Sequence, residues 1–105
     1  MLPNSARLKS SFDFARTTKG RRFSSDALTG YLLITNEDQP AKLGLIVGKS
    51  VGNSVTRHRI ARQIRHAAKA KVLSMPAGSL LVVRATRKPT NAFYETQTLM
   101  QKVTV

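Results

Sequence analysis

One stretch of the chain limits its fold more than any other feature: the twenty residues Val55–Ser74 contain neither glycine nor proline. The segment Gly52–Ser54 precedes this stretch and supplies turn and N-cap residues, and Met75-Pro76 ends it. The pattern predicts one long helix over these residues, and we expect it to be the main helix of the protein.

This predicted helix is divided lengthwise into a basic face and an apolar stripe. At 100° per residue, basic-type side chains fill one arc of about 120°; they are His58, Arg59, Arg62, Arg65, His66 and Lys69. Ile60, Ile64, Ala67 and Ala68 lie opposite, so we expect them to pack on a sheet. Arg57 falls outside the basic face, and we expect it to reach over a strand edge towards Tyr31.

Shorter elements flank the main helix. We expect a first helix that begins near Ser10-Ser11, with Asp13 in its first turn, and ends near Lys19-Gly20. Alternating or apolar runs predict strands over Arg21–Ser25, Leu28–Thr35, Leu43–Gly48 and Ser79–Thr86. A last helix is expected from Thr90, its predicted N-cap, to about Lys102. The element order α-β-β-β-α-β-α predicts an α/β (α+β) two-layer sandwich, with a four-stranded sheet packed against about three helices.

Two glycines in the third predicted strand leave two alternatives open. Gly44 and Gly48 flank Ile46 on one face of that strand. Side chains this small would leave room for a ligand, but they are equally typical of a bulge or of a tight packing contact.

The charge of the chain indicates its partner. The 105 residues, enough for a single domain over 1–105, include 18 Lys or Arg but only 5 Asp or Glu, a formal net charge of +13. No acidic residue occurs between Gln39 and Tyr94. Solvent-exposed helix faces normally carry acidic partners for their basic residues, and so strong a charge favours a polyanion. We therefore expect a nucleic-acid-binding domain, with RNA or DNA as its partner.

Other features exclude several classes of protein. The absence of cysteine excludes disulfide frameworks, thiolate zinc sites and thiol nucleophiles, and is compatible with a reducing cytoplasm. The longest apolar runs, Tyr31–Ile34 and Leu80–Val83, are too short to cross a bilayer. The segment Met1–Phe14 has no apolar stretch of signal-peptide type. We expect a soluble cytoplasmic protein that does not bind membranes.

The run from Gly44 to Arg65, GLIVGKSVGNSVTRHRIARQIR, resembles the signature of the bacterial ribonuclease P protein subunit. Three further features agree: Arg7-Leu8-Lys9 followed by Phe14, Gly20 before a strand that contains Tyr31, and a Val-Val-Arg strand followed by a short helix. The chain departs from the family pattern at Thr18, where another aromatic is common, at His58, where Asn is usual, and at Ala61, where a second basic residue is common.

The resemblance implies an accessory subunit with no catalytic residues and no bound metal of its own. Proteins of this family bind a large catalytic RNA and the 5′ leader of precursor tRNA, and the RNA with its Mg²⁺ removes the leader. The family fold has a left-handed strand-helix-strand crossover, which general handedness rules oppose. We expect one protein monomer per RNA.

The resemblance also assigns residues to two surfaces. Lys49, Asn53, Arg59, Arg62 and Arg65 map to the helix that faces the catalytic RNA, and Lys69 continues the same basic face. Phe14, Tyr31, Arg57 and His58 map to the leader cleft. Single-stranded RNA needs aromatic stacking platforms beside cations, which favours Phe14 and Tyr31 for this role, although core positions remain an alternative for both. Phe12, Phe93 and Tyr94 are assigned to packing.

Two classes of rival function, a nuclease and a structural RNA-binding protein, compete with this one. A protein-only ribonuclease would need His58 and His66 at one phosphate, but eight helical residues separate them by ~12 Å along the axis. A metal-dependent nuclease would need clustered carboxylates, and the five acidic residues are scattered over surface-like segments. A ribosomal or other structural RNA-binding protein of similar fold stays open on composition.

Overall fold

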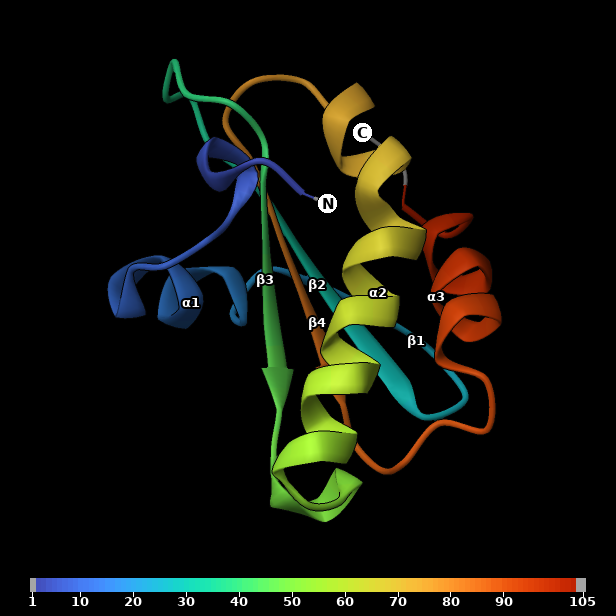
Figure 1. The fold of residues 1–105 in the computed structure, drawn as a ribbon. Coiled ribbons are helices and arrows are strands. Elements are labelled where there is room, and N and C mark those ends of the chain that lie inside the picture. The colour runs from blue at the N-terminus through green and yellow to red at the C-terminus, as the bar shows by residue number, and fades with distance from the viewer. Residues whose placement is uncertain (1, 104–105) are drawn as a thin grey trace.

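The computed structural model describes residues 2–103 and shows a four-stranded sheet with helices on both faces (Figure 1). Its elements in chain order are η1 (Asn4–Ala6), α1 (Ser11–Thr17), β1 (Arg21–Ser25), β2 (Leu28–Ile34), β3 (Lys42–Val47), η2 (Lys49–Val51), α2 (Ser54–Ser74), β4 (Ser79–Ala85) and α3 (Ala92–Met100). The predicted fold class and element order are confirmed; the two short 3-10 helices were not predicted.

The strands lie in the order β1-β2-β4-β3. β2 pairs antiparallel with both β1 and β4, whereas β3 and β4 are parallel neighbours joined by α2. In Figure 1, β3 and β4 run downward, α2 lies on the viewer's side and β4 lies to the right of β3. This arrangement is a left-handed crossover, against the right-handed form that such connections adopt in about 98% of cases.

The main core lies between the sheet and the layer formed by α2 and α3. Side chains from alternate positions of the strands meet the apolar stripe of α2 there; the fully buried members include Leu28, Leu81, Val83, Ile64, Ala68 and Leu99. Ile60 is also buried, but Ala67 is only half-buried because it lies at the margin of the stripe. The predicted apolar stripe is therefore the surface that attaches α2 to the sheet.

The opposite face of the sheet carries a much smaller core. Leu8, Leu80 and Val82 are buried there, and four half-buried side chains pack around them: Phe14, Tyr31, Leu33 and Ile46. Within the described part of the chain, only α1 and the N-terminal segment cover this face (Figure 1). Part of the sheet surface therefore stays accessible beside α1, and we call this surface the open sheet face.

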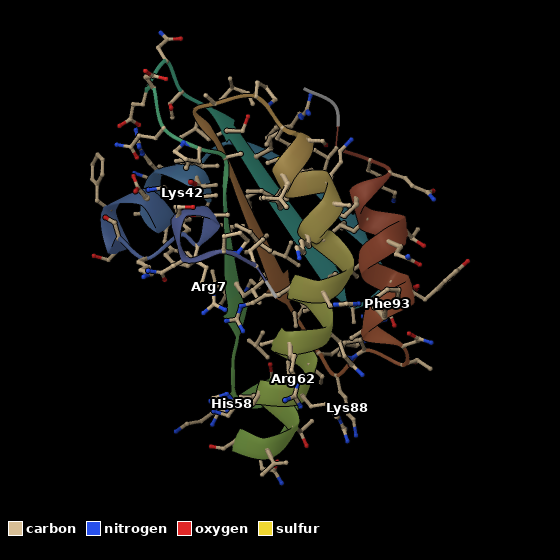
Figure 2. The ribbon with its side chains drawn as sticks, turned by 45° about the horizontal axis from the view of Figure 1, so that its top comes forward. Arg7, Lys42, His58, Arg62, Lys88 and Phe93 are labelled. Carbon is tan, nitrogen blue, oxygen red and sulfur yellow. The ribbon has the colours of Figure 1, made fainter. Side chains whose placement is uncertain are left out.

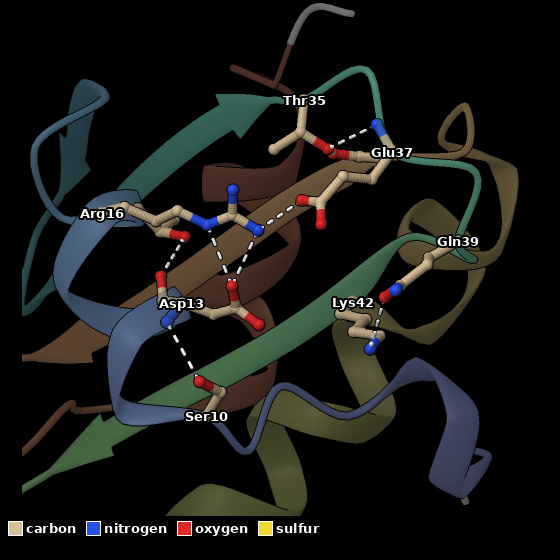
Figure 3. A network of polar contacts seen from close by, with 9 residues as sticks. Ser10, Asp13, Arg16, Thr35, Glu37, Gln39 and Lys42 are labelled. Atoms are coloured by element: carbon tan, nitrogen blue, oxygen red, sulfur yellow. Dashed lines mark hydrogen bonds and ion pairs between the residues drawn. The ribbon is translucent and has the colours of Figure 1, made fainter.

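A small polar network attaches α1 to the sheet (Figure 3). The hydroxyl of Ser10 caps the helix by accepting a hydrogen bond from the Asp13 N–H at 3.4 Å. The Arg16 guanidinium donates to Asp13 at 2.9 Å and pairs with Glu37, which lies in the loop between β2 and β3. Because Glu37 is 21 residues away in the chain, this ion pair fixes the helix against the loop.

The ends of the two longer helices follow capping chemistry. The side-chain oxygen of Asn53 accepts from the Thr56 N–H at 2.9 Å, which confirms the predicted start of α2. The prediction of Thr90 as the cap of α3 is wrong: Asn91 caps it and accepts from the Tyr94 N–H at 3.0 Å. Asn91 holds this position because the buried Glu95 carboxylate accepts its backbone N–H at 3.1 Å.

Candidate nucleic-acid interface

The basic face of α2 lies in solvent along the length of the helix. His58, Arg59, Arg62 and His66 are exposed, and Arg65 and Lys69 are half-buried at its margin. Figure 2 shows His58 and Arg62 on this face. None of these six side chains forms an ion pair within residues 2–103. The face is therefore available to an external anion along its whole length.

Lys49 and Asn53 lie at the start of α2 with different surroundings. Lys49 is exposed in η2. Asn53 is also exposed; its side-chain oxygen caps the helix, and its amide NH₂ group can donate to a ligand. Gly52 between them has a φ of 151°, and a Cβ there would lie 2.9 Å from the Thr56 side chain. A glycine is therefore required for the turn that places Lys49 beside the helix.

The N-terminal segment adds a cation that the sequence reasoning assigned to no site. The Leu8 N–H donates to the Leu43 carbonyl at 2.9 Å, which extends the sheet past β3 and brings Arg7 beside α2. Arg7 then lines one pocket with His58, Arg62, Arg65 and His66. Burial, and next the charge of Arg7, lower the pKa of Arg65 below its usual value. Like charges thus crowd together here, and a bound phosphate would relieve their repulsion.

Arg57 and His58 lie at the free edge of β3, with Leu45, Val47, Ala61 and Arg65 lining the same pocket. Arg57 donates to the Ser54 hydroxyl at 3.3 Å. The expectation that Arg57 reaches towards Tyr31 is wrong. α2 packs against the face that carries Leu45 and Val47, whereas Tyr31 points from the opposite face and lies two strands away from β3.

A groove along the edge of β3 joins the pocket of Arg57 and His58 to the region around Phe14. Its lining includes Arg7, Lys9 and Phe14 from the N-terminal part of the chain, Gly44 and Leu45 of β3, and Arg65 of α2. Leu45 and Arg65 also line the pocket of Arg57 and His58, so the two pockets adjoin. Phe14 therefore lies at one end of a basic groove and His58 at the other.

Of the two roles left open for the glycines near β3, Gly44 makes a tight packing contact. A Cβ at this position would lie 2.6 Å from the ring of Phe14 and 2.9 Å from the Leu8 side chain. Gly48 differs, since nothing lies within 4 Å of its would-be Cβ. Phe14 consequently packs over the β3 backbone, and half-burial leaves part of its ring accessible.

Tyr31 lies on the open sheet face between two arginines that the sequence reasoning did not assign to a site. Arg22 is its register partner on β1, and Arg84 of β4 pairs with Thr29 one step along the same face. Both arginines are exposed, and Tyr31 is half-buried. The alternation of side chains along each strand predicts which residues of that strand share a face. The pairing of β1, β2 and β4, which brings Arg22, Tyr31 and Arg84 together, cannot be read from it.

The aromatic residues assigned to packing behave differently from one another. Phe12 is 69% exposed, with the Arg16 guanidinium 5.2 Å from its ring centroid, and Tyr94 is 66% exposed. The packing assignment is therefore wrong for both. Phe93 is 37% exposed and contacts His66, so it packs only in part.

The carboxylates and histidines do not gather into a site. Asp13 and Glu37 both pair with Arg16, and Glu95 is buried as the cap partner of α3. Within residues 2–103 no group of three histidine or acidic side chains is placed to hold a metal ion. His58 and His66 lie two turns apart on α2. No helix in the described part of the chain has the length and apolar character needed to span a membrane.

Comparison with known proteins identifies the family of the chain. The family model "Ribonuclease P" matches residues 2–104. The ribonuclease P protein component of Acidothermus cellulolyticus is 40% identical over 87 residues, which cover 81% of this chain and 72% of that protein. That of Nocardioides sp. is 37% identical over 95 residues, covering 88% and 81%.

Solved structures agree with the sequence match. The RNase P protein of Staphylococcus aureus has 28% sequence identity and a TM-score of 0.75, covering 95% of this chain and 93% of that one. The Thermotoga maritima protein, at 17% identity and a TM-score of 0.75, shares the fold. The chain belongs to the ribonuclease P protein family.

Proposed function

We propose that the chain is the accessory protein subunit of a ribonuclease P holoenzyme, in which the RNA performs the chemistry. Family membership supports a role in RNA-associated tRNA processing. The main support for an accessory role is the basic face of α2. Its side chains pair with no carboxylate within residues 2–103, and Arg7 extends it. Such a surface fits a folded polyanion, while the scattered acidic residues fit no catalytic pair.

The basic face of α2 would contact the phosphates of the catalytic RNA. Arg59 and Arg62 project into solvent, and their planar guanidinium groups can each bind two phosphate oxygens. Lys49 and Lys69 would extend this contact towards the two ends of the helix. Arg65 and Arg7 would share a phosphate, because their proximity already disfavours two uncompensated charges.

The open sheet face would bind the 5′ leader of precursor tRNA. Tyr31 and Phe14 lie on this face and supply rings for stacking with unpaired bases, while Arg22 and Arg84 supply cations for the intervening phosphates. Arg57 and His58 would contact the same strand only after it passes Phe14 along the groove at the β3 edge.

The Mg²⁺ needed for phosphodiester hydrolysis would be held by the RNA. The described residues provide no set of carboxylates and histidines that fits this ion. The chain's own residues bind the RNA and the substrate strand and hold them in position. One protein per RNA is sufficient for these contacts.

Reconstitution tests this proposal. Precursor tRNA should be cleaved at the mature 5′ end when the protein, ribonuclease P RNA and Mg²⁺ are combined, and not by the protein with Mg²⁺ alone. His58→Ala combined with His66→Ala should retain cleavage when protein is saturating. RNA-free cleavage that the double substitution abolishes would instead identify a histidine nuclease.

A further inference from the structure

A pair of aromatic rings lies between α2 and α3, where His66, at the margin of the basic face of α2, meets Phe93, which has no role in the contacts proposed above. The ring centroids of His66 and Phe93 are 5.6 Å apart, and the ring planes are tilted by 39°. His66 is exposed on α2, and Phe93, in the first turn of α3, keeps more than a third of its surface in solvent. The core therefore leaves part of this ring pair uncovered.

The surroundings of the ring pair are basic. A groove next to it is lined by Arg59 and Gln63 of α2 and by Lys88 and Asn91 of the loop before α3. Gln63 lies one helical turn before His66 on the same side of α2, so this groove adjoins the ring pair. Figure 2 shows Arg62, Lys88 and Phe93 around the same part of α2.

Nearby carboxylates offset little of this charge. Glu95, on α3, is buried and accepts hydrogen bonds from the Ala27 and Asn91 N–H groups. Asp26 lines a different pocket, with Arg87 and Lys88, and can compensate at most one of these cations. Arg59 and Arg62 form no ion pair within residues 2–103.

We infer that the His66–Phe93 pair stacks with an unpaired base of the ribonuclease P RNA while Arg59 and Lys88 bind an adjoining phosphate. Every nucleobase offers a flat π-face to such a platform, and cations beside the rings are typical of single-strand binding surfaces. A second copy of this chain fits the surface less well, because two strongly basic surfaces would repel each other. The inference rests on the proposed function and extends the RNA contact from α2 onto α3.

Replacing the ring at position 93 tests the stacking. Phe93→Leu keeps apolar volume but removes the ring, so affinity for the cognate ribonuclease P RNA should fall roughly 5- to 100-fold, whereas Phe93→Tyr should bind like the wild type. The slope of log affinity against log salt should not change, since no charge is lost. Lys88→Gln should instead reduce the magnitude of that slope by about one, because one phosphate contact is lost. Tyr94→Leu, on the same helix, is the matched control and should change affinity little.

A second measurement keeps the test independent of any effect on folding. The chain contains no tryptophan, so Phe93→Trp introduces a single indole. Its fluorescence should be strongly quenched when the RNA binds, and that of Tyr94→Trp should be quenched much less. Equal quenching at both positions, or wild-type affinity of Phe93→Leu, would overturn the inference.

The two levels of the proposal fail in different ways. If wild-type protein does not bind ribonuclease P RNA, the proposed function fails and this inference fails with it. If wild-type binding is strong and salt-dependent while the position-93 variants behave like their Tyr94 controls, only the contact on α3 is wrong.

Discussion

At the scale of single residues, Gly44 and Gly48 allow a direct comparison of stability, because a Cβ would clash at one position and not at the other. Gly44→Ala should destabilise the protein by ~1 to 3 kcal/mol, because its Cβ would lie 2.6 Å from the Phe14 ring and force a well-packed contact apart. Gly48→Ala should be close to neutral, since its Cβ meets nothing within 4 Å. Urea denaturation measures both, and equal effects would contradict the packing described for Phe14.

At the same scale, Tyr31 tests the leader assignment. Removing one stacking ring typically costs ~1 to 3 kcal/mol of binding, so Tyr31→Ala should weaken holoenzyme binding of precursor tRNA that carries a leader of several nucleotides. Binding of mature tRNA, which has no leader, should be almost unchanged. Tyr31→Phe keeps the ring and serves as the control. Equal losses for both ligands would mean that Tyr31 supports the fold or the contact with the catalytic RNA.

At the scale of elements, the ion pair between Arg16 of α1 and Glu37 predicts a small pH dependence of stability. The hydrogen bond from Arg16 lowers the pKa of Glu37 from its usual value of 4.5. A carboxyl whose pKa is lower in the folded state stabilises the fold above its unfolded pKa, and this contribution is lost as the pH falls through the folded value. Glu37→Gln should therefore reduce stability slightly at pH 6, and its difference from the wild type should vanish in acid.

The size of this effect is small because exposed ion pairs contribute little and are screened by salt. Thermal unfolding of the wild type and the variant between pH 3 and pH 7 gives the comparison. Asp38→Asn removes a neighbouring charge from the same loop and should show no such pH-dependent difference. A Glu37→Gln difference that grows in acid would mean that the ion pair does not stabilise α1.

Elements were more predictable than the contacts between them. Local signals, such as the Asn53 cap and the glycine- and proline-free run after it, predict α2 correctly. The start of α3 was misplaced because Glu95, a long-range partner of Ala27, selects Asn91 over Thr90. Phe14 and Tyr31, both predicted to line the leader cleft, lie on the same side of the sheet, but their role there stays a prediction. Arg57 was wrongly expected to reach Tyr31, because strand order cannot be read from the sequence and β4 lies between β2 and β3.

At the scale of the whole molecule, charge separates into distinct surfaces. Two of the five acidic residues pair with Arg16 near α1, and a third is buried. The basic face of α2 keeps its cations without ion pairs within residues 2–103, and Arg7 adds to them. The compact state therefore carries an uncompensated positive field that a bound polyanion would offset.

The salt dependence of binding to ribonuclease P RNA tests the central claim most directly. For about five or six phosphate contacts, the slope of log affinity against log salt should be roughly −3 to −6. Arg62→Ala should reduce the magnitude of this slope by about one and change stability by no more than about 0.5 kcal/mol, because the side chain is exposed. A slope near zero, or an Arg62→Ala variant with the wild-type slope, would contradict binding through the basic face of α2.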